Sequence, residues 1–168
     1  MTPIVIFNQL IKEFPNIKPK SKESAKKILP LYPSPKLAEI TAALLTDGHI
    51  DWYTSDGHPR PRRILLYSDN KSECKWLVET CKELFRIDGR VQKYTSETGY
   101  SKESSYKAII NNATLARILI LTGVPAGNKT KVPISIVAVI EKVLRRKAKI
   151  PEWARFLIQS FNARSLRE

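Results

Sequence analysis

Lys36–Gly48 reads KLAEITAALLTDG, the pattern of a short amphipathic helix that stops at a turn. Alanine and threonine separate large apolar residues that recur at helical spacing, namely Leu37, Ile40, Leu44 and Leu45. Small side chains every three or four positions let two helix backbones approach closely. We therefore expect a helix over Lys36–Asp47 whose small residues would let a second copy pack closely, with Gly48 ending it at a positive φ.

The sequence after Gly48 changes to the alternation typical of a β-strand. Ile50 and Trp52 alternate with polar residues, so we expect both side chains to face the helices. Arg62–Ser68 alternates again, and the polar segment Thr54–Pro61 between the two runs is expected to form a long basic loop. These segments predict a β-hairpin directly after the helix.

The same order of elements then repeats. One apolar stripe predicts a helix over Asn70–Arg86, after which Arg90–Ser96 and Ser104–Ile110 predict a second hairpin. A helix from Asn112 to Gly123 follows. The order over residues 36–122 is therefore α-β-β-α-β-β-α, which predicts an α+β fold. We expect a four-stranded antiparallel sheet with helices on one face and a polar, basic second face.

The remaining segments flank this unit, and the whole chain is expected to form a single domain, residues 1–168. Residues 1–34 predict an N-terminal helical extension, residues 35–123 the core, and residues 124–168 two further helices. No apolar run approaches the ~20 residues needed to span a bilayer, and the N-terminus does not resemble a signal peptide. We expect a cytoplasmic or otherwise intracellular protein that binds no membrane.

Charge indicates the class of partner. The 168 residues contain 29 Lys and Arg against 16 Asp and Glu, a formal net charge of +13, which favours a polyanion such as DNA or RNA. Cys74 and Cys81 lie on one helix face but about 10 Å apart along the axis, too far for a disulfide. We expect both to be reduced core thiols.

Asp47 is the main candidate for chemistry. If two copies of the helix pack about a two-fold axis, their Asp47 carboxylates meet at the base of both sheets. Paired carboxylates with nearby backbone carbonyls suit Mg²⁺, which can activate water and neutralise the leaving oxygen of a phosphodiester. Asp-Gly also makes a good turn, so the helix alone leaves both interpretations open.

The nine residues Ile40–Gly48, followed by a strand opening with His49-Ile50, resemble the motif of the LAGLIDADG homing endonucleases. Leu45 stands where the family has its first acid, and Asp47 matches the acid that holds metal. The αββαββα order and Gly123-Val124-Pro125 are similar to the family's unit. The resemblance covers most of the chain from residue 35 onward.

The C-terminal segment resembles the approach to a second such helix. Arg164 stands in place of the metal-holding acid, Ser165 stands in place of the glycine, and no second sheet follows. The resemblance therefore implies the single-motif, intron-encoded type. Such a protein works as a homodimer through its 36–48 helix.

The resemblance implies a sequence-specific endonuclease that makes double-strand breaks in a long pseudo-palindromic site of double-stranded DNA. Asp47 and Thr46 would hold the metal, which is Mg²⁺, with Ca²⁺ or Mn²⁺ able to occupy the same site. Asn70 would order water, and Lys129 would act near the scissile phosphate, with Lys131 as the alternative. Asn70 also suits a helix cap.

Strand alternation predicts which side chains face the DNA. The residues expected to do so are His49, Asp51, Tyr53, Ser55, Arg63, Leu65, Tyr67, Gln92, Tyr94, Ser96, Ser105 and Lys107, with Arg60, Arg62 and Lys131 beside them. Arginine with guanine and glutamine with adenine are the usual major-groove pairs. Two alternatives stay open, an RNA maturase that assists splicing of an intron RNA and a catalytically inactive DNA-binding protein on the same scaffold.

Overall fold

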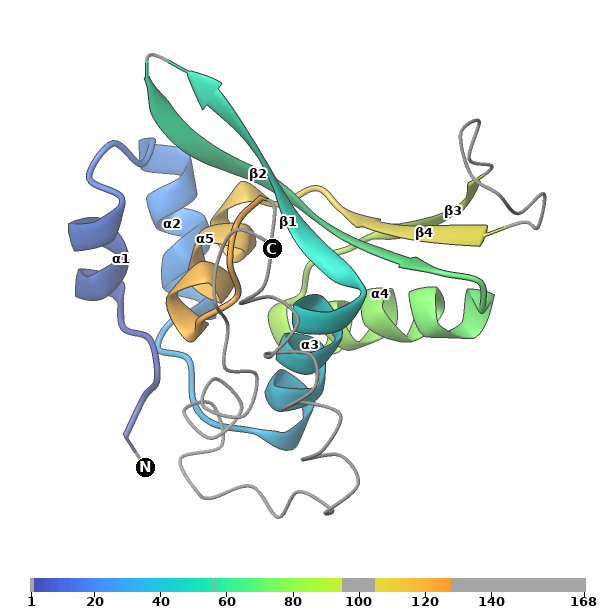
Figure 1. The fold of residues 1–168 in the computed structure, drawn as a ribbon. Helices are drawn as coiled ribbons and strands as arrows, with labels where there is room; N and C mark the ends of the chain where they lie inside the picture. Colours follow the sequence, from blue (N-terminus) through green and yellow to red (C-terminus); the bar gives the residue numbers. More distant parts are fainter. Residues whose placement is uncertain (1, 56, 95–104, 128–168) are drawn as a thin grey trace, which may run out of the picture.

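The computed structural model describes residues 2–55, 57–94 and 105–127, and it shows the predicted α+β fold. Two helices, α1 (Phe7–Glu13) and α2 (Pro19–Ile28), precede the repeating unit. The unit comprises α3 (Pro35–Thr46), β1 (Gly48–Ser55), β2 (His58–Ser68), α4 (Lys71–Phe85), β3 (Arg90–Tyr94), β4 (Ser105–Ile110) and α5 (Ala113–Thr122). This is the expected αββαββα order (Figure 1).

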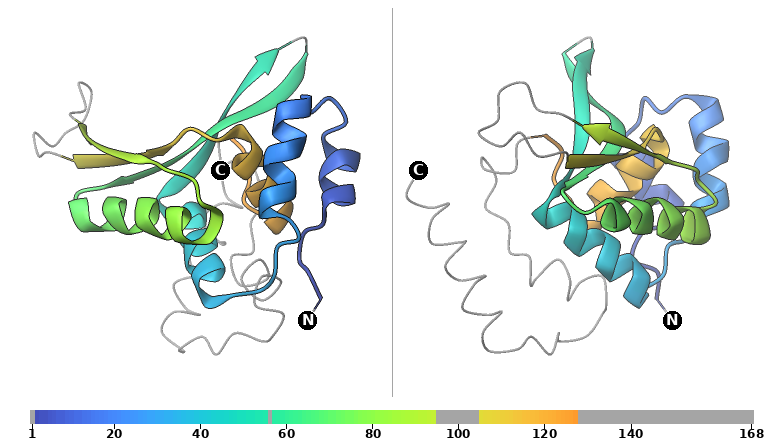
Figure 2. Two further views of the ribbon diagram at one scale, coloured as in Figure 1. Left: turned by 180° about the vertical axis from the view of Figure 1, so that it is seen from behind. Right: turned by 90° about the vertical axis from the view of Figure 1, so that its right-hand side faces the viewer.

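The four strands form one antiparallel sheet in the order β1-β2-β4-β3. Helix α4 packs on β2, β3 and β4, α5 packs on β2, and α3 packs against β1. These three helices lie on the same side of the sheet, and α1 and α2 contact α5 from outside (Figure 2). Within the described residues, no helix is long and apolar enough to cross a bilayer.

The core lies between the sheet and these helices, and the N-terminal extension contributes to it. Ile40, Leu44 and Leu77 from the helices are fully buried with Ile64 and Ile110 from the sheet. Val5, Leu10 and Ala25 belong to the same apolar cluster. Cys74 and Cys81 are buried and unpaired, as expected, and burial raises the pKa of the Cys81 thiol to about 12.

The structure corrects two expectations at the start of the sheet. Gly48 does not end α3 at a positive φ. The C-cap residue of the helix is Asp47, which has αR backbone angles, and Gly48 is already the first residue of β1. The expected loop over Thr54–Pro61 is mostly strand, because β1 continues to Ser55 and β2 begins at His58. The hairpin therefore extends well beyond the other strands (Figure 1).

Trp52 also departs from its expected place. The β1–β2 register shifts after Asp51, where Arg62 has no partner in β1, and Trp52 is 42% exposed instead of buried. Its indole covers the backbone of Gly127, where an added Cβ would lie 2.0 Å from Nε1. The Gly127 N–H donates a 3.0 Å hydrogen bond to the Ile50 carbonyl. The segment after α5 thus lies along the outer edge of β1.

Candidate functional site

Asp47 lies at the junction of α3 and β1. Ser34 begins the helix, because its Oγ accepts a 3.2 Å hydrogen bond from the Leu37 N–H. At the other end the Asp47 N–H donates a 3.1 Å hydrogen bond to the Ala43 carbonyl. Asp47 is exposed. Its position at the base of the sheet is set by the capped helix before it and by the first strand after it.

A shallow pocket of about 530 Å³ opens beside Asp47. It is lined by Asp47, Tyr67, Ser68, Asp69, Asn70, Glu73 and Ser105. Two of the three residues predicted to be catalytic, Asp47 and Asn70, therefore share a pocket although they come from different elements. The sequence interpretation missed Asp69 and Glu73, and Asp69 could have been found as the acid that directly follows β2.

Asn70 is held by the start of α4. Its side-chain Oδ1 accepts from the Ser72 N–H at 3.0 Å and from the Ser72 hydroxyl at 2.6 Å. Its own N–H donates to the Ser68 hydroxyl, which donates to Glu73. Asn70 therefore caps α4, as one of its two interpretations predicted. Its role in ordering water stays a prediction, and the side-chain amide that would do so is oriented by these hydrogen bonds.

The oxygen donors around the pocket have the chemistry that Mg²⁺ prefers, but one described chain does not complete a site. Among the described residues, no group of three or more His, Cys, Asp or Glu side chains is placed to hold a metal ion. The Thr46 hydroxyl donates to the Ala42 and Ala43 carbonyls, so its proton is committed within the helix.

The cross-strand register gathers most of the residues predicted to face DNA on one face of the sheet. We call this the outer face, since no described helix packs on it. It carries His49 and Asp51 of β1, Arg63, Leu65 and Tyr67 of β2, Gln92 of β3, and Ser105 and Lys107 of β4. Leu65, although predicted to face DNA, is buried there and only 3% exposed. Tyr67 and Ser105 also line the Asp47 pocket, so the pocket adjoins this face.

Neighbouring side chains on the outer face contact one another. The Arg63 Nε donates to Asp51 at 2.7 Å, His49 and Tyr67 stack with ring centroids 6.0 Å apart, and the Lys107 ammonium lies 5.7 Å from the Tyr67 ring centroid. These contacts hold cationic and aromatic groups in a defined arrangement. The face is thus ordered before any partner binds.

Register adds one residue that the sequence interpretation missed. Arg90 pairs with Ile109, and Ile109 pairs with Leu65, which places Arg90 on the outer face with Gln92. The alternation of Arg90, Gln92 and Tyr94 carried this signal, because residues two apart share a face. Tyr94 pairs with Ser105.

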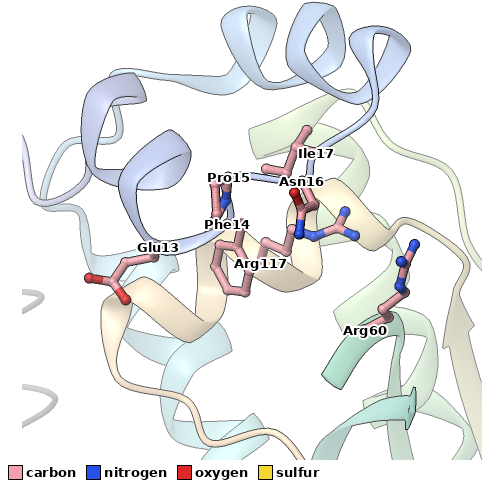
Figure 3. A pocket seen from close by; sticks show the side chains of 7 residues that line it. All are labelled: Glu13, Phe14, Pro15, Asn16, Ile17, Arg60 and Arg117. Atoms are coloured by element: carbon pink, nitrogen blue, oxygen red, sulfur yellow. The ribbon is translucent and has the colours of Figure 1, made fainter. Parts of the chain in front are cut away.

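The other predicted contacts lie apart from this set. Tyr53 and Ser55 belong to the protruding part of the hairpin, where they pair with Arg60 and His58. Arg62 is exposed beside the register shift. Arg60 lines a different pocket, together with Arg117 of α5 (Figure 3). Ser96, Lys129, Lys131 and the predicted C-terminal helices lie outside the described residues.

Neither the comparison with protein-family models nor the search of curated proteins returned a match to this chain.

Proposed function

We propose that this protein is a metal-dependent, sequence-specific DNA endonuclease of the LAGLIDADG homing type that acts as a homodimer. The observation that carries the proposal is the position of Asp47. Its exposed carboxylate lies at the end of α3, in an open pocket that adjoins an ordered face bearing Arg63, Gln92 and Lys107. A carboxylate beside a basic surface is the arrangement needed to bring metal to a bound phosphodiester.

The outer face supplies the binding chemistry. Arginine and lysine contact phosphates or guanine, and glutamine makes a bidentate pair with adenine. A two-stranded ribbon such as the β1–β2 hairpin also fits the major groove of DNA. The formal charge of +13 adds attraction to the duplex that does not depend on sequence.

The proposal includes a second copy because no group of three or more His, Cys, Asp or Glu side chains among the described residues is placed to hold a metal ion. Glu39, Ala42 and Thr46 form a solvent-accessible stripe along α3, in which Ala42 is small and half-buried. Packing this stripe against its symmetry mate brings the two Asp47 carboxylates together at the helix ends.

In the shared site, Asp47 of each protomer would hold a divalent cation, most simply Mg²⁺. The cation lowers the pKa of bound water and neutralises charge on the phosphoryl oxygens. Asn70, oriented by Ser72 and Ser68, would hold water by hydrogen bonds. Lys129 would stabilise negative charge developing on the scissile phosphate.

The test replaces Asp47 by its uncharged isostere. The substrate is a plasmid carrying the DNA formed by joining the two flanks of the gene. With Mg²⁺ we expect wild type to make a double-strand break. Asp47→Asn should cut at least ~100-fold more slowly because the metal loses its carboxylate.

Binding provides the control readout. Asp47→Asn should bind the same DNA within about 3-fold of wild type, because the carboxylate serves the metal and not the grooves. Glu79→Gln, an acid-to-amide change on the exposed side of α4, should leave both cutting and binding unchanged. Cutting by Asp47→Asn at the wild-type rate would refute the site.

A further inference from the structure

A second pocket, of about 230 Å³, lies where the N-terminal extension meets the repeating unit. Residues 13–17, at the end of α1 and in the loop before α2, form one wall. Arg60 of β2 and Arg117 of α5 form the other (Figure 3). None of these residues lines the Asp47 pocket, so the two sites are distinct.

Arg117 is the central residue of this pocket. Its guanidinium Cζ lies 5.9 Å from the centroid of the Phe14 ring, and Nη1 donates a 3.3 Å hydrogen bond to the Ala113 carbonyl one turn earlier. In the part of the chain that the structure describes, no carboxylate forms an ion pair with it. The Arg117 guanidinium is thus positioned by the Phe14 ring and by the uncharged Ala113 carbonyl.

The pocket concentrates positive charge. Burial lowers the pKa of Arg117, and the nearby charge of Arg60 lowers it further, although Tyr53 acts in the opposite direction. Figure 3 shows the Arg60 and Arg117 side chains extending toward the same region beside Asn16. The Glu13 carboxylate lies at the other end of the pocket and points away from them (Figure 3).

We propose that the Arg60–Arg117 pocket binds a phosphate group of a nucleic-acid backbone. Two guanidinium groups offer planar forks that match phosphate oxygens. Asn16 and Phe14 complete a pocket with polar and aromatic walls.

Arg60 belongs to the hairpin that also carries Arg63 and Asp51 of the outer face, whereas Arg117 belongs to α5 on the helix-covered side of the sheet. The choice of DNA as the source of the phosphate rests on the proposed function. The binding of phosphate itself does not.

The first experiment probes the anion alone. The unfolding midpoint of wild type is compared in sodium phosphate and in sodium chloride of equal ionic strength. We expect phosphate to raise it by ~2 °C or more, because ligand that binds only the folded state stabilises it. Arg117→Gln and, separately, Arg60→Gln should lose this gain, while Arg86→Gln, at the exposed end of α4, should keep it.

The second experiment probes nucleic acid. Affinity for a random-sequence duplex of about 30 bp is measured between about 50 and 200 mM NaCl. Loss of one phosphate contact should reduce the slope of log affinity against log salt by about 1. We expect this reduction in Arg117→Gln and in Arg60→Gln, but not in Arg86→Gln.

Each other outcome overturns part of the proposal. A phosphate effect that needs Arg117, with an unchanged salt slope, would assign the pocket to a free anion and refute the nucleic-acid assignment. Absence of both effects, or equal effects in Arg86→Gln, would refute the pocket. If wild type binds no duplex but phosphate still stabilises it through Arg117, the proposed function fails and the anion site stands.

Discussion

Gly48 occupies the closest approach between α3 and the sheet. A Cβ at this position would lie 2.7 Å from the Leu44 Cδ2 atom and 2.8 Å from the Leu65 carbonyl oxygen. The Leu44 methyl can rotate away, but the carbonyl belongs to the β2 backbone and cannot. Any larger residue therefore moves the strand that begins beside Asp47. Close approach, and not a positive φ, explains the glycine after the aspartate.

Gly48→Ala is expected to lower the free energy of unfolding by about 1–3 kcal/mol through overpacking, as measured by urea denaturation. Gly57→Ala is the comparison, because Gly57 has a φ of +75° and no atom within 4 Å of an added Cβ. That variant should lose about 1 kcal/mol, from backbone conformation alone. A smaller loss for Gly48→Ala than for Gly57→Ala would contradict the steric explanation.

At the scale of the element, α4 shows how the packing of a helix keeps the residues at its N-terminal end in the pocket. Asn70 begins the helix and lines the Asp47 pocket. One turn and more along the helix, Leu77 and Cys81 are fully buried against the sheet, while Lys75 and Glu79 remain exposed. The N-terminal end of α4 therefore stays beside the pocket because the buried side of the helix, with Leu77 and Cys81, is packed against the sheet.

Leu77→Ala is expected to cost about 2–5 kcal/mol of folding free energy, because a fully buried leucine leaves a cavity when truncated. Chemical denaturation monitored by tryptophan fluorescence measures the loss. Lys75→Ala on the exposed side of the same helix is the control and should change stability by no more than ~0.5 kcal/mol. Equal losses in the two variants would show that α4 does not pack as described.

For the whole molecule, the proposed activity depends on a second copy. In the proposal Asp47 is the metal-binding carboxylate at the end of α3, and the described residues contain no cluster of three ligands. A dimer would double the formal charge of +13 to +26, which suits a long duplex and predicts binding that weakens steeply with salt. The oligomeric state therefore separates the nuclease from its alternatives.

Light scattering should give a mass of twice 19.2 kDa. Ala42→Arg places a long charged side chain in the middle of the proposed α3 interface, and we expect it to shift the protein to the monomer and abolish cleavage. Glu79→Arg, on the exposed side of α4, should stay dimeric. A wild-type monomer would exclude the paired site and favour the inactive DNA-binding protein or the RNA maturase.

The hairpin shows why sequence prediction succeeded for elements and failed for details. Alternation of apolar and polar residues located β1 and β2, because burial on one face imposes a period of two. Pro59 and Pro61 suggested a loop, yet both lie within β2. They are tolerated where β2 has left β4, whose pairing begins only at Ile64. Trp52 was misplaced because a register shift has no signature in the alternation itself.

The sequence by itself determined the order of helices and strands over the described residues, most of the buried stripe of α3, α4 and α5, and Asp47 as the acid at the end of α3. These follow from local periodicity and capping, which act over a few residues. Only the tertiary structure showed that Asp47 shares a pocket with Asn70, Asp69 and Glu73, that Gly48 is required by the Leu65 carbonyl, and that Arg60 meets Arg117. Such contacts depend on strand register and on how helices pack, and both are set by the core as a whole.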